Sequence, residues 1–412
     1  MKVLHTADWH LGKRFDQMEL SKEHQYFLDW LIETINNRHI DLLLIAGDIF
    51  DSGNPSNTAL KQYYDFLWKV KTTCCKSVVI IGGNHDSVST LNAPKDLLKH
   101  LQVYVVGGAP DDFKEEIIPI KNQVGATEII VCAIPFLRDK DIRLSVSGET
   151  SAERETRIKE GIASHYRQLV SHILNFKQQN IPVIATGHLY AAGAITTDSE
   201  KDIHVGNLGQ IGSEEFPDEY DYIALGHLHR PQLVNKKEHI RYSGSPVALS
   251  FSETDHAKIV LLLDFNDGIL SAVEEIEVPC TRKLYRIKGD EAAVKKAIAA
   301  LPDDSYELPA WVDIEVETDN YLPVIEEQLN QLLIDKHNIE YLFIRQKRIN
   351  KIKNLNEQMV EALSLNQLNP KTVFQKRCES MFPSGDFTEL MLTFDEAIEK
   401  MGQQDTAGET AL

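Results

Sequence analysis

The chain has few cysteines, and their arrangement excludes two classes of protein. Five occur in 412 residues: Cys74, Cys75, Cys132, Cys280 and Cys378. Their number is odd, two are adjacent, and no Cys-x-x-Cys pair exists, so neither a disulfide framework nor a thiolate-bound zinc site is expected. Reduced thiols of this kind are typical of a cytoplasmic protein.

Long apolar runs are missing as well. No secretory signal or membrane-spanning segment is visible, because residue 1 leads almost directly into a short apolar strand. We therefore expect a cytoplasmic location and no membrane partner. No internal repeat or long low-complexity segment is present. The length is ample for a large catalytic domain with one or two additions.

Positive charge is scarce. The chain has 43 Lys and Arg against 62 Asp and Glu, a net charge of −19. From residue 290 onward the counts are 12 and 23, so the acidic excess is concentrated in the C-terminal third. Nucleic-acid binding normally depends on a basic surface, so this chain alone is not expected to hold DNA tightly. One cluster runs against the trend: residues 345–353 hold five basic side chains. A solvated linker and a phosphate contact both remain open for it.

What the sequence does contain is metal-binding side chains after five apolar segments. The segments are residues 2–5, 41–46, 77–81, 181–185 and 222–225. Continuous apolar runs of this length are typical of strands buried on both faces. The side chains that follow them are Asp8-Trp9-His10, Gly47-Asp48-Ile49-Phe50-Asp51, Gly83-Asn84-His85-Asp86, Gly187-His188 and Gly226-His227-Leu228-His229.

Each motif is weak by itself. A lone histidine after a strand is more often packed or on the surface than a ligand, and Gly83-Asn84 has the composition of a simple turn. A purely structural role of these residues does not explain why five such motifs occur together, each after an apolar strand. In open α/β sheets, functional groups lie outside the carboxyl ends of the strands. The set supplies carboxylate, amide and imidazole ligands for two divalent metals, which clamp a phosphoryl group for in-line displacement. It therefore predicts phosphoester hydrolysis.

These motifs resemble those of the calcineurin-like metallophosphoesterase superfamily. Within it the chain is similar to the bacterial SbcD family of nuclease subunits, which are related to the archaeal and eukaryotic double-strand-break repair nuclease. Residues 1–12, 47–53, 226–231 and 243–246 carry the resemblance. It is specific over roughly the first 280 residues and looser to about residue 400.

The resemblance implies a domain plan. A four-layer α/β sandwich, the metallophosphoesterase nuclease domain, would span residues 1–278, followed by a small α+β capping domain at 279–350. Helices at 351–400 would bind the coiled coils of an SbcC-type ABC ATPase, and 401–412 would be a disordered tail. The sequence of the cap itself predicts strand, helix, strand, helix and strand, with helices near 291–301 and 322–334 and strands near 311–316 and 341–344.

The resemblance also assigns the site. One metal would be held by Asp8, His10, Asp48 and His229, and the other by Asp48, Asn84, His188 and His227, with Asp48 bridging. This mixed donor set suits manganese, with magnesium as a substitute.

Further residues near the motifs receive roles outside the coordination sphere. His85 would be the catalytic residue facing the scissile phosphate, where it stabilises charge or protonates the departing oxygen. Asp51 stands where the archaeal and eukaryotic relatives have a histidine, and is expected to orient a ligand. Asp86 either orients His85 or forms a turn. His5, Asp16 and His24 are expected to be structural or surface residues.

The implied function is a metal-dependent DNA nuclease subunit within an ATP-dependent complex. It would degrade double-stranded ends 3′ to 5′ and cut hairpins and single strands, as a homodimer within a heterotetramer. One alternative is a small-molecule phosphodiesterase of the same superfamily, which the additional C-terminal segments disfavour. Another is an inactive scaffold for the ATPase, which the complete ligand set disfavours.

Overall fold

The computed structural model describes residues 1–15, 18–122, 124–142, 150–194, 210–302, 306–318, 322–334 and 338–348, together with residue 336 and eight positions between 374 and 394. The chain divides into two compact units. The first comprises residues 1–316 and 322–346, and the second comprises 317–321 and 347–412.

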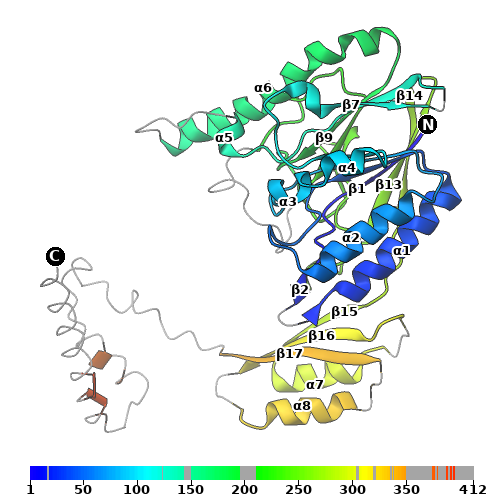
Figure 1. The fold of residues 1–412 in the computed structure, drawn as a ribbon. Coiled ribbons are helices and arrows are strands. Elements are labelled where there is room, and N and C mark those ends of the chain that lie inside the picture. Colours follow the sequence, from blue (N-terminus) through cyan, green and yellow to red (C-terminus); the bar gives the residue numbers. More distant parts are fainter. Residues whose placement is uncertain are drawn as a thin grey trace, which may run out of the picture. The chain divides into compact units, whose positions relative to one another are not determined.

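Two six-stranded sheets form the framework of the first unit (Figure 1). The first sheet has the order β14-β13-β1-β4-β5-β6, in which β1, β4, β5 and β6 are parallel and β13 and β14 are antiparallel additions. Its strands are β1 (Lys2–Thr6), β4 (Leu42–Ala46), β5 (Ser77–Ile81), β6 (Val103–Val106), β13 (Ile259–Asn266) and β14 (Ile269–Glu277).

The second sheet has the order β11-β12-β10-β9-β8-β7. Strands β8, β9, β10 and β12 are parallel, and the outer strands β7 and β11 are antiparallel to their neighbours. The strands are β7 (Ile117–Lys121), β8 (Thr127–Cys132), β9 (Val183–His188), β10 (Tyr222–Gly226), β11 (Gln232–Val234) and β12 (Lys237–Tyr242).

Helices cover the outer faces of both sheets. Helices α1 (Ser21–Arg38) and α2 (Asn57–Val70) pack on the first sheet, and α6 (Ser151–Gln178) packs on the second. The two inner sheet faces share a third apolar layer. This arrangement confirms the predicted four-layer α/β sandwich. Short elements complete it: β2 (Arg14–Phe15), β3 (Met18–Glu19), α3 (Val88–Asn92), α4 (Lys95–Lys99), η1 (Phe113–Glu116) and α5 (Asp139–Ile142).

The continuous apolar strands follow from these layers. Successive side chains on a strand point to opposite faces. In β4, Leu43 and Ile45 therefore pack against the helices, whereas Leu42 and Leu44 pack against the second sheet. The five predicted strands are confirmed, with shifted ends. Strand β9 extends to His188 and β10 to Gly226, so these residues belong to their strands and do not follow them.

Helix starts are marked by side-chain caps. Ser56 Oγ accepts the backbone N–H of Ala59 (3.2 Å) where α2 begins. At the start of α6, Thr150 and Glu153 form a capping box, in which each side chain accepts the other residue's backbone N–H.

The three-stranded sheet of the first unit confirms the alternation predicted for residues 283–348. Its order is β15-β16-β17, and one apolar core joins it to two helices. Helix α8 begins at Ile325, three residues later than predicted, after Pro323. The elements are β15 (Leu284–Gly289), α7 (Glu291–Ala299), β16 (Ala310–Thr318), α8 (Ile325–Ile334) and β17 (Ile339–Arg348).

Charged side chains lie on the other face of this sheet. Arg282 binds the carboxylate of Glu23 on α1, and its guanidinium lies 4.0 Å from the ring centroid of Trp311. Arg345, the first residue of the basic cluster, is ion-paired with the buried Asp313. Arg345 is therefore not part of a solvated linker, and Lys351 and Lys353 lie outside the described residues.

Of the second unit, the structure describes only a few positions. Phe374, Cys378, Leu390 and Met391 are helical, and the rings of Phe374 and Phe394 stack with centroids 4.1 Å apart. The predicted helical region 351–400 otherwise lies outside the described residues, as does the whole predicted tail 401–412.

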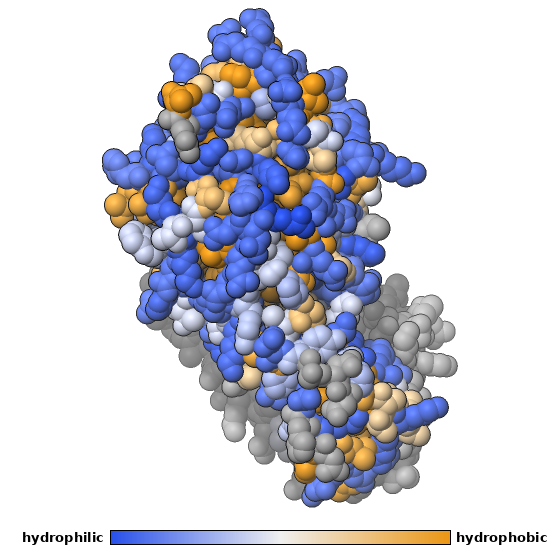
Figure 2. Space-filling model, turned by 90° about the vertical axis from the view of Figure 1, so that its right-hand side faces the viewer, coloured by the Kyte–Doolittle hydropathy of each residue, from blue (hydrophilic) through white to orange (hydrophobic). Residues whose placement is uncertain are grey.

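The surface carries mainly hydrophilic residues where Figure 2 shows it, with apolar side chains scattered in small groups. Trp68 on α2 and Leu97 on α4 are the most exposed large aromatic and aliphatic side chains, apart from Val124, among the residues described. Within the described part of the chain, none of the helices combines the length and apolarity needed to cross a membrane.

Candidate metal centre

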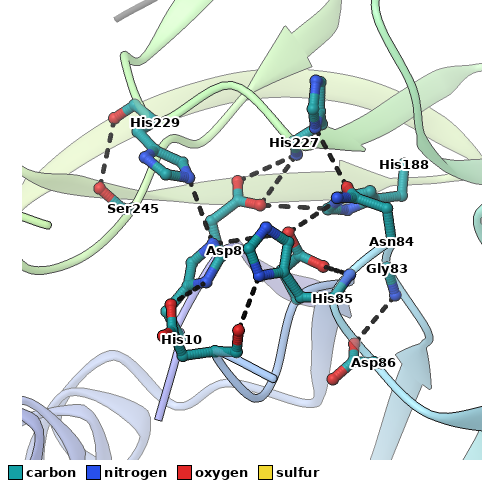
Figure 3. A network of polar contacts seen from close by, with 12 residues as sticks. Asp8, His10, Gly83, Asn84, His85, Asp86, His188, His227, His229 and Ser245 are labelled. Carbon is teal, nitrogen blue, oxygen red and sulfur yellow. Dashed lines mark hydrogen bonds and ion pairs between the residues drawn. The ribbon is translucent and has the colours of Figure 1, made fainter. Parts of the chain in front are cut away.

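The carboxyl ends of five strands meet at one place, between the two sheets (Figure 3). Strands β1, β4 and β5 supply one side, and β9 and β10 supply the other. Apart from Asn84 and His85, which are partly exposed, the predicted site residues are buried. All the side chains predicted from the sequence come together here: Asp8, His10, Asp48, Asn84, His85, His188, His227 and His229.

The backbone at this site adopts an unfavourable conformation. Asp8, His10, Asp48 and His227 have φ angles of 54°, 47°, 49° and 100°, in the region that side chains other than glycine rarely occupy. Backbone hydrogen bonds hold it, from Asp8 N to Gly47 O and from His10 N to Asp48 O, both 3.0 Å. Strain of this kind concentrates at functional sites because the surrounding structure enforces it.

Glycines allow the strand ends to approach each other. A Cβ on Gly226 would lie 1.9 Å from the carbonyl oxygen of Ala46, where the two sheets meet. A Cβ on Gly83 would lie 2.1 Å from Asp48 Oδ1. Both positions therefore require a residue without a side chain.

The Gly83 contact leads to the first prediction. Gly83→Ala must displace the Asp48 carboxylate, so we expect manganese affinity to fall by at least about tenfold, as when support for a ligand is lost. Gly53→Ala is the matched control, since the nearest atom to its added Cβ would lie at 3.6 Å. Calorimetric titration with Mn²⁺ measures both. Equal affinities for the two variants would show that the close approach is not needed for metal binding.

The first cluster of donors consists of Asp8, His10 and His229, whose ligand atoms lie within 4.8 Å of one another. The Nε2 atoms of His10 and His229 are only 3.2 Å apart. Each of these rings has its Nδ1 beside a carboxylate, at 3.3 Å from Asp51 for His10 and 3.1 Å from Glu253 for His229. A proton on each Nδ1 leaves two lone pairs converging on one point, which is an arrangement that a cation fits.

A second cluster consists of Asp8, Asp48 and His188. His188 Nδ1 lies 3.0 Å from the carbonyl oxygen of Ala46, and its Nε2 lies 2.9 Å from Asn84 Oδ1. The same Asn84 oxygen is 3.2 Å from His227 Nδ1. These donors surround a second position that suits a divalent cation.

Asp48 belongs to the second cluster and also faces the first, and Asp8 belongs to both. Its Oδ2 is 3.4 Å from His10 Nε2 and 3.3 Å from His188 Nε2. Its Oδ1 accepts the backbone N–H of His85 at 2.9 Å. One carboxylate thus reaches both groups of histidines, as a bridging ligand must.

Without metal, Asp8 and His188 hold their protons more tightly than isolated side chains do, whereas Asp48 is ionised. Burial, together with the negative charge of Asp48, raises the pKa of Asp8 to about 7. Burial disfavours a charged His188, yet the charge and hydrogen bond of Asp48 raise the pKa of His188 to about 9. His188 and His10 hold the pKa of Asp48 well below its usual value despite burial.

A pH dependence follows from these pKa values. A metal needs the unprotonated forms of Asp8 and His188, so its binding must displace protons whenever the pH lies below about 9. We expect apparent manganese affinity to rise between about pH 6 and pH 9. Titration calorimetry at pH 7 in two buffers of different ionisation enthalpy detects the released protons. Identical heats in both buffers would contradict the prediction.

His85 is oriented by the backbone. Its Nδ1 lies 2.7 Å from the carbonyl oxygen of Asp51, and its ring packs edge-on against His10 with centroids 4.7 Å apart. An Nδ1–H donated to the carbonyl directs Nε2 away from it. His10, Asp51 and His85 also form a third group with closely spaced ligand atoms. His10 already belongs to the first cluster.

The two neighbouring aspartates differ in their contacts. Asp51 Oδ1 lies beside His10 Nδ1 and 3.1 Å from Lys13 Nζ, which is the place expected of an orienting residue. The carboxylate of Asp86 accepts the backbone N–H groups of Ile49, Phe50 and Gly83 at 2.9–3.1 Å. Asp86 therefore holds the two metal-site loops together. The sequence had suggested that it either orients His85 or forms a turn.

Three other residues near the motifs were considered from the sequence, and one residue that contacts a site histidine was not. His5 and His24 are fully buried, and Asp16 lies outside the described residues. The sequence did not indicate Glu253, whose carboxylate contacts His229. It follows no apolar strand and lies 24 residues after the histidine, so no local signal could have revealed it.

Comparisons with known proteins identify the family of the chain. Residues 1–231 match the family model for calcineurin-like phosphoesterases, and residues 280–382 match that of the type 5 capsule protein repressor C-terminal domain. The chain is 39% identical to the SbcD subunit of the SbcCD nuclease of Escherichia coli strain K12, over 92% of both chains. It is 31% identical to the SbcD subunit from Bacillus subtilis, over 79% of this chain and 81% of the relative. For the SbcD subunit from Rhodobacter capsulatus the identity is 32%, with 74% and 75% covered.

Proposed function

This chain belongs to the SbcD nuclease subunits of the calcineurin-like phosphoesterase family, and on that premise we propose that it hydrolyses DNA phosphodiester bonds with two divalent cations. The observation that carries the proposal is the pair of donor clusters, which share Asp8, with the carboxylate of Asp48 facing a histidine of each. A phosphoester bound across two cations has both its attacking and its leaving oxygen stabilised.

Seven residues would hold the metals. When bound, the two cations supply an activated water and neutralise charge on the phosphoryl group. Oxygen and imidazole donors with no thiolate suit manganese, with magnesium as a substitute. Asp8, His10, Asp48 and His229 would hold one ion, and Asp48, Asn84, His188 and His227 would hold the other.

His85 would act on the substrate directly. Its Nδ1–H is committed to the Asp51 carbonyl, so the ring has a fixed direction. As an imidazolium, the ring then directs its Nε2–H at the scissile phosphate and donates that proton to the departing sugar oxygen. It is partly exposed, as is Asn84, whereas the other six proposed ligands are buried, and this exposure suits a residue that meets a large substrate.

The substrates would be DNA ends and single-stranded or hairpin structures, degraded 3′ to 5′ from ends and cut internally elsewhere. The test is a manganese-dependent cleavage assay on end-labelled duplex, hairpin and single-stranded DNA, with bis-p-nitrophenyl phosphate beside them. Rapid turnover of the small diester without DNA cleavage would favour the small-molecule phosphodiesterase. No turnover of either would favour the scaffold.

An ATPase would supply the grip on DNA that this acidic chain lacks. The relatives are named as one subunit of an SbcCD nuclease, and we extend this to an SbcC-type ABC ATPase as partner, in a cytoplasmic heterotetramer with two copies of this chain. We further propose nuclease, cap, docking and tail regions at 1–278, 279–350, 351–400 and 401–412. Stimulation of the cleavage assay by the ATPase and ATP tests this.

Deletion of residues 351–412 separates catalysis from docking. All seven metal ligands lie at or before His229, and the deleted segment lies outside the first compact unit. We expect manganese-dependent cleavage of single strands to persist, while binding to the ATPase and stimulation by ATP are lost. Pull-down and cleavage assays measure both. Undiminished copurification would show that the tail is not the docking element.

A further inference from the structure

A buried glutamate lies behind one of the metal ligands. Glu253 is 1% exposed and sits in the loop between β12 and β13. Its Oε1 is 3.1 Å from His229 Nδ1. Its Oε2 is 3.0 Å from Ser245 Oγ and 3.2 Å from the backbone nitrogen of Leu249. The Lys258 ammonium lies 2.5 Å from the same oxygen.

These contacts fix the carboxylate and, through it, the imidazole. Three donors bind Oε2 and fix the carboxylate. Its other oxygen, Oε1, therefore lies beside His229, where it can accept a hydrogen bond. An ionised carboxylate can only accept hydrogen bonds, so the proton of a neutral His229 must sit on Nδ1. The lone pair is then on Nε2, the atom that faces His10 Nε2 at 3.2 Å.

Stability alone does not account for this buried charge pair. Removing a carboxylate and an ammonium from water is costly, and well-packed apolar residues often replace such pairs without loss of stability. Lys258 Nζ also contacts Ser245 Oγ at 2.9 Å and the carbonyl oxygen of His229 at 3.4 Å. The network therefore surrounds His229 from its ring to its backbone.

The two clusters differ in what stands behind their histidines. Carboxylates of Asp51 and Glu253 lie behind His10 and His229 in the first cluster. In the second, the hydrogen-bond partner of His188 Nδ1 is the neutral carbonyl of Ala46 at 3.0 Å, and the Asp8 carboxylate, itself a metal-ligand candidate, lies farther away at 3.9 Å. A carboxylate makes an imidazole a more basic ligand and fixes its orientation. Glu253 is thus placed to act on one metal position and not on the other.

We propose that Glu253 is a positioning residue for His229 and raises the affinity of the first-cluster metal position selectively. The inference rests on the proposed two-metal function and deepens it. Glu253→Gln keeps the size of the side chain and removes its charge. In full-length protein we expect one of two Mn²⁺ affinities to fall about 10- to 100-fold while the other changes less than about twofold.

The chain offers a matched control. Glu116 is also a fully buried glutamate paired with a histidine, with Oε2 2.8 Å from His165 Nε2, and neither residue belongs to the metal centre. Glu116→Gln makes the same chemical change elsewhere, so both Mn²⁺ affinities should stay at their wild-type values. Titration calorimetry, with electron paramagnetic resonance of bound Mn²⁺, resolves the two positions.

A double-mutant cycle assigns the effect to His229. If Glu253 acts through that ring, Glu253→Gln adds no further loss of Mn²⁺ affinity to a His229→Asn variant, because residues acting on one interaction are not additive. Additive losses would overturn the proposal. The charge-neutral variant Glu253→Gln/Lys258→Met serves if the single substitution fails to fold, and the same selective loss is expected.

The outcomes separate this inference from the proposed function. Wild-type protein that binds no Mn²⁺ refutes the two-metal function itself. Wild-type protein with two sites and a Glu253→Gln variant of unchanged affinities refutes only the positioning role. Equal weakening of both sites, accompanied by a lowered melting temperature, would make Glu253 a structural residue and would also refute it.

Discussion

Asp48→Ala is expected to reduce manganese-dependent DNA cleavage to background, a loss of at least about 10³-fold, the upper end of what removal of one electrostatic contact produces. The carboxylate lies 3.3–3.4 Å from imidazole nitrogens of both clusters, so both metal positions lose a ligand at once. Cleavage of labelled DNA and elemental analysis of bound manganese measure the two losses together.

Asp48→Asn is the companion variant. It keeps the shape of the side chain and an oxygen that can accept the N–H of His85, but removes the charge. We expect the same loss of activity with the melting temperature less affected than in Asp48→Ala. Full activity in either variant, or wild-type activity that survives exhaustive chelation, would refute the two-metal site.

His85→Gln should remove most of the cleavage, about 10²- to 10⁴-fold as for loss of a general acid, and leave two manganese ions bound. The reason is that its Nδ1 is occupied by the carbonyl of Asp51 and its ring lies beside His10, outside the pair of clusters. Rate measurements at saturating manganese, with metal content determined on the same samples, test both halves of the prediction.

His100→Gln is the control, since this histidine is exposed at the end of α4, away from the metal centre. It should cleave at the wild-type rate. A loss of manganese from His85→Gln in proportion to its loss of activity would instead make His85 a ligand, in the third group with His10 and Asp51.

The donor clusters could be predicted because each motif is local to one strand end. An apolar run buried on both faces fixes where a strand ends, and the parallel order of β1, β4 and β5 brings their ends to one edge. Asp8, Asp48 and Asn84 therefore converge for a reason that is already visible in the sequence.

The supporting residues could not be predicted in this way. Glu253 meets His229 through a loop whose path depends on the packing of the sheets, and its distance along the chain carries no signal. Asp86 lies next to His85, yet it bonds three backbone N–H groups of the loops after β4 and β5. Because Asp86 is next to His85 in the sequence, the His85 side chain was the expected partner. In the folded chain the partners of Asp86 are backbone groups.

The metal centre joins distant parts of the chain, and this has a consequence for translation. The backbone N–H of His227 donates to Asp8, 219 residues earlier, and β1 pairs with β13 (Ile259–Asn266). A ribosome adding about 5–20 residues per second needs roughly 10–50 s to pass from Asp8 to His227, or from β1 to β13. Until then a nascent chain lacks His227 and His229, and its first sheet is incomplete. The metal centre therefore cannot assemble on a nascent chain before β13 has been added.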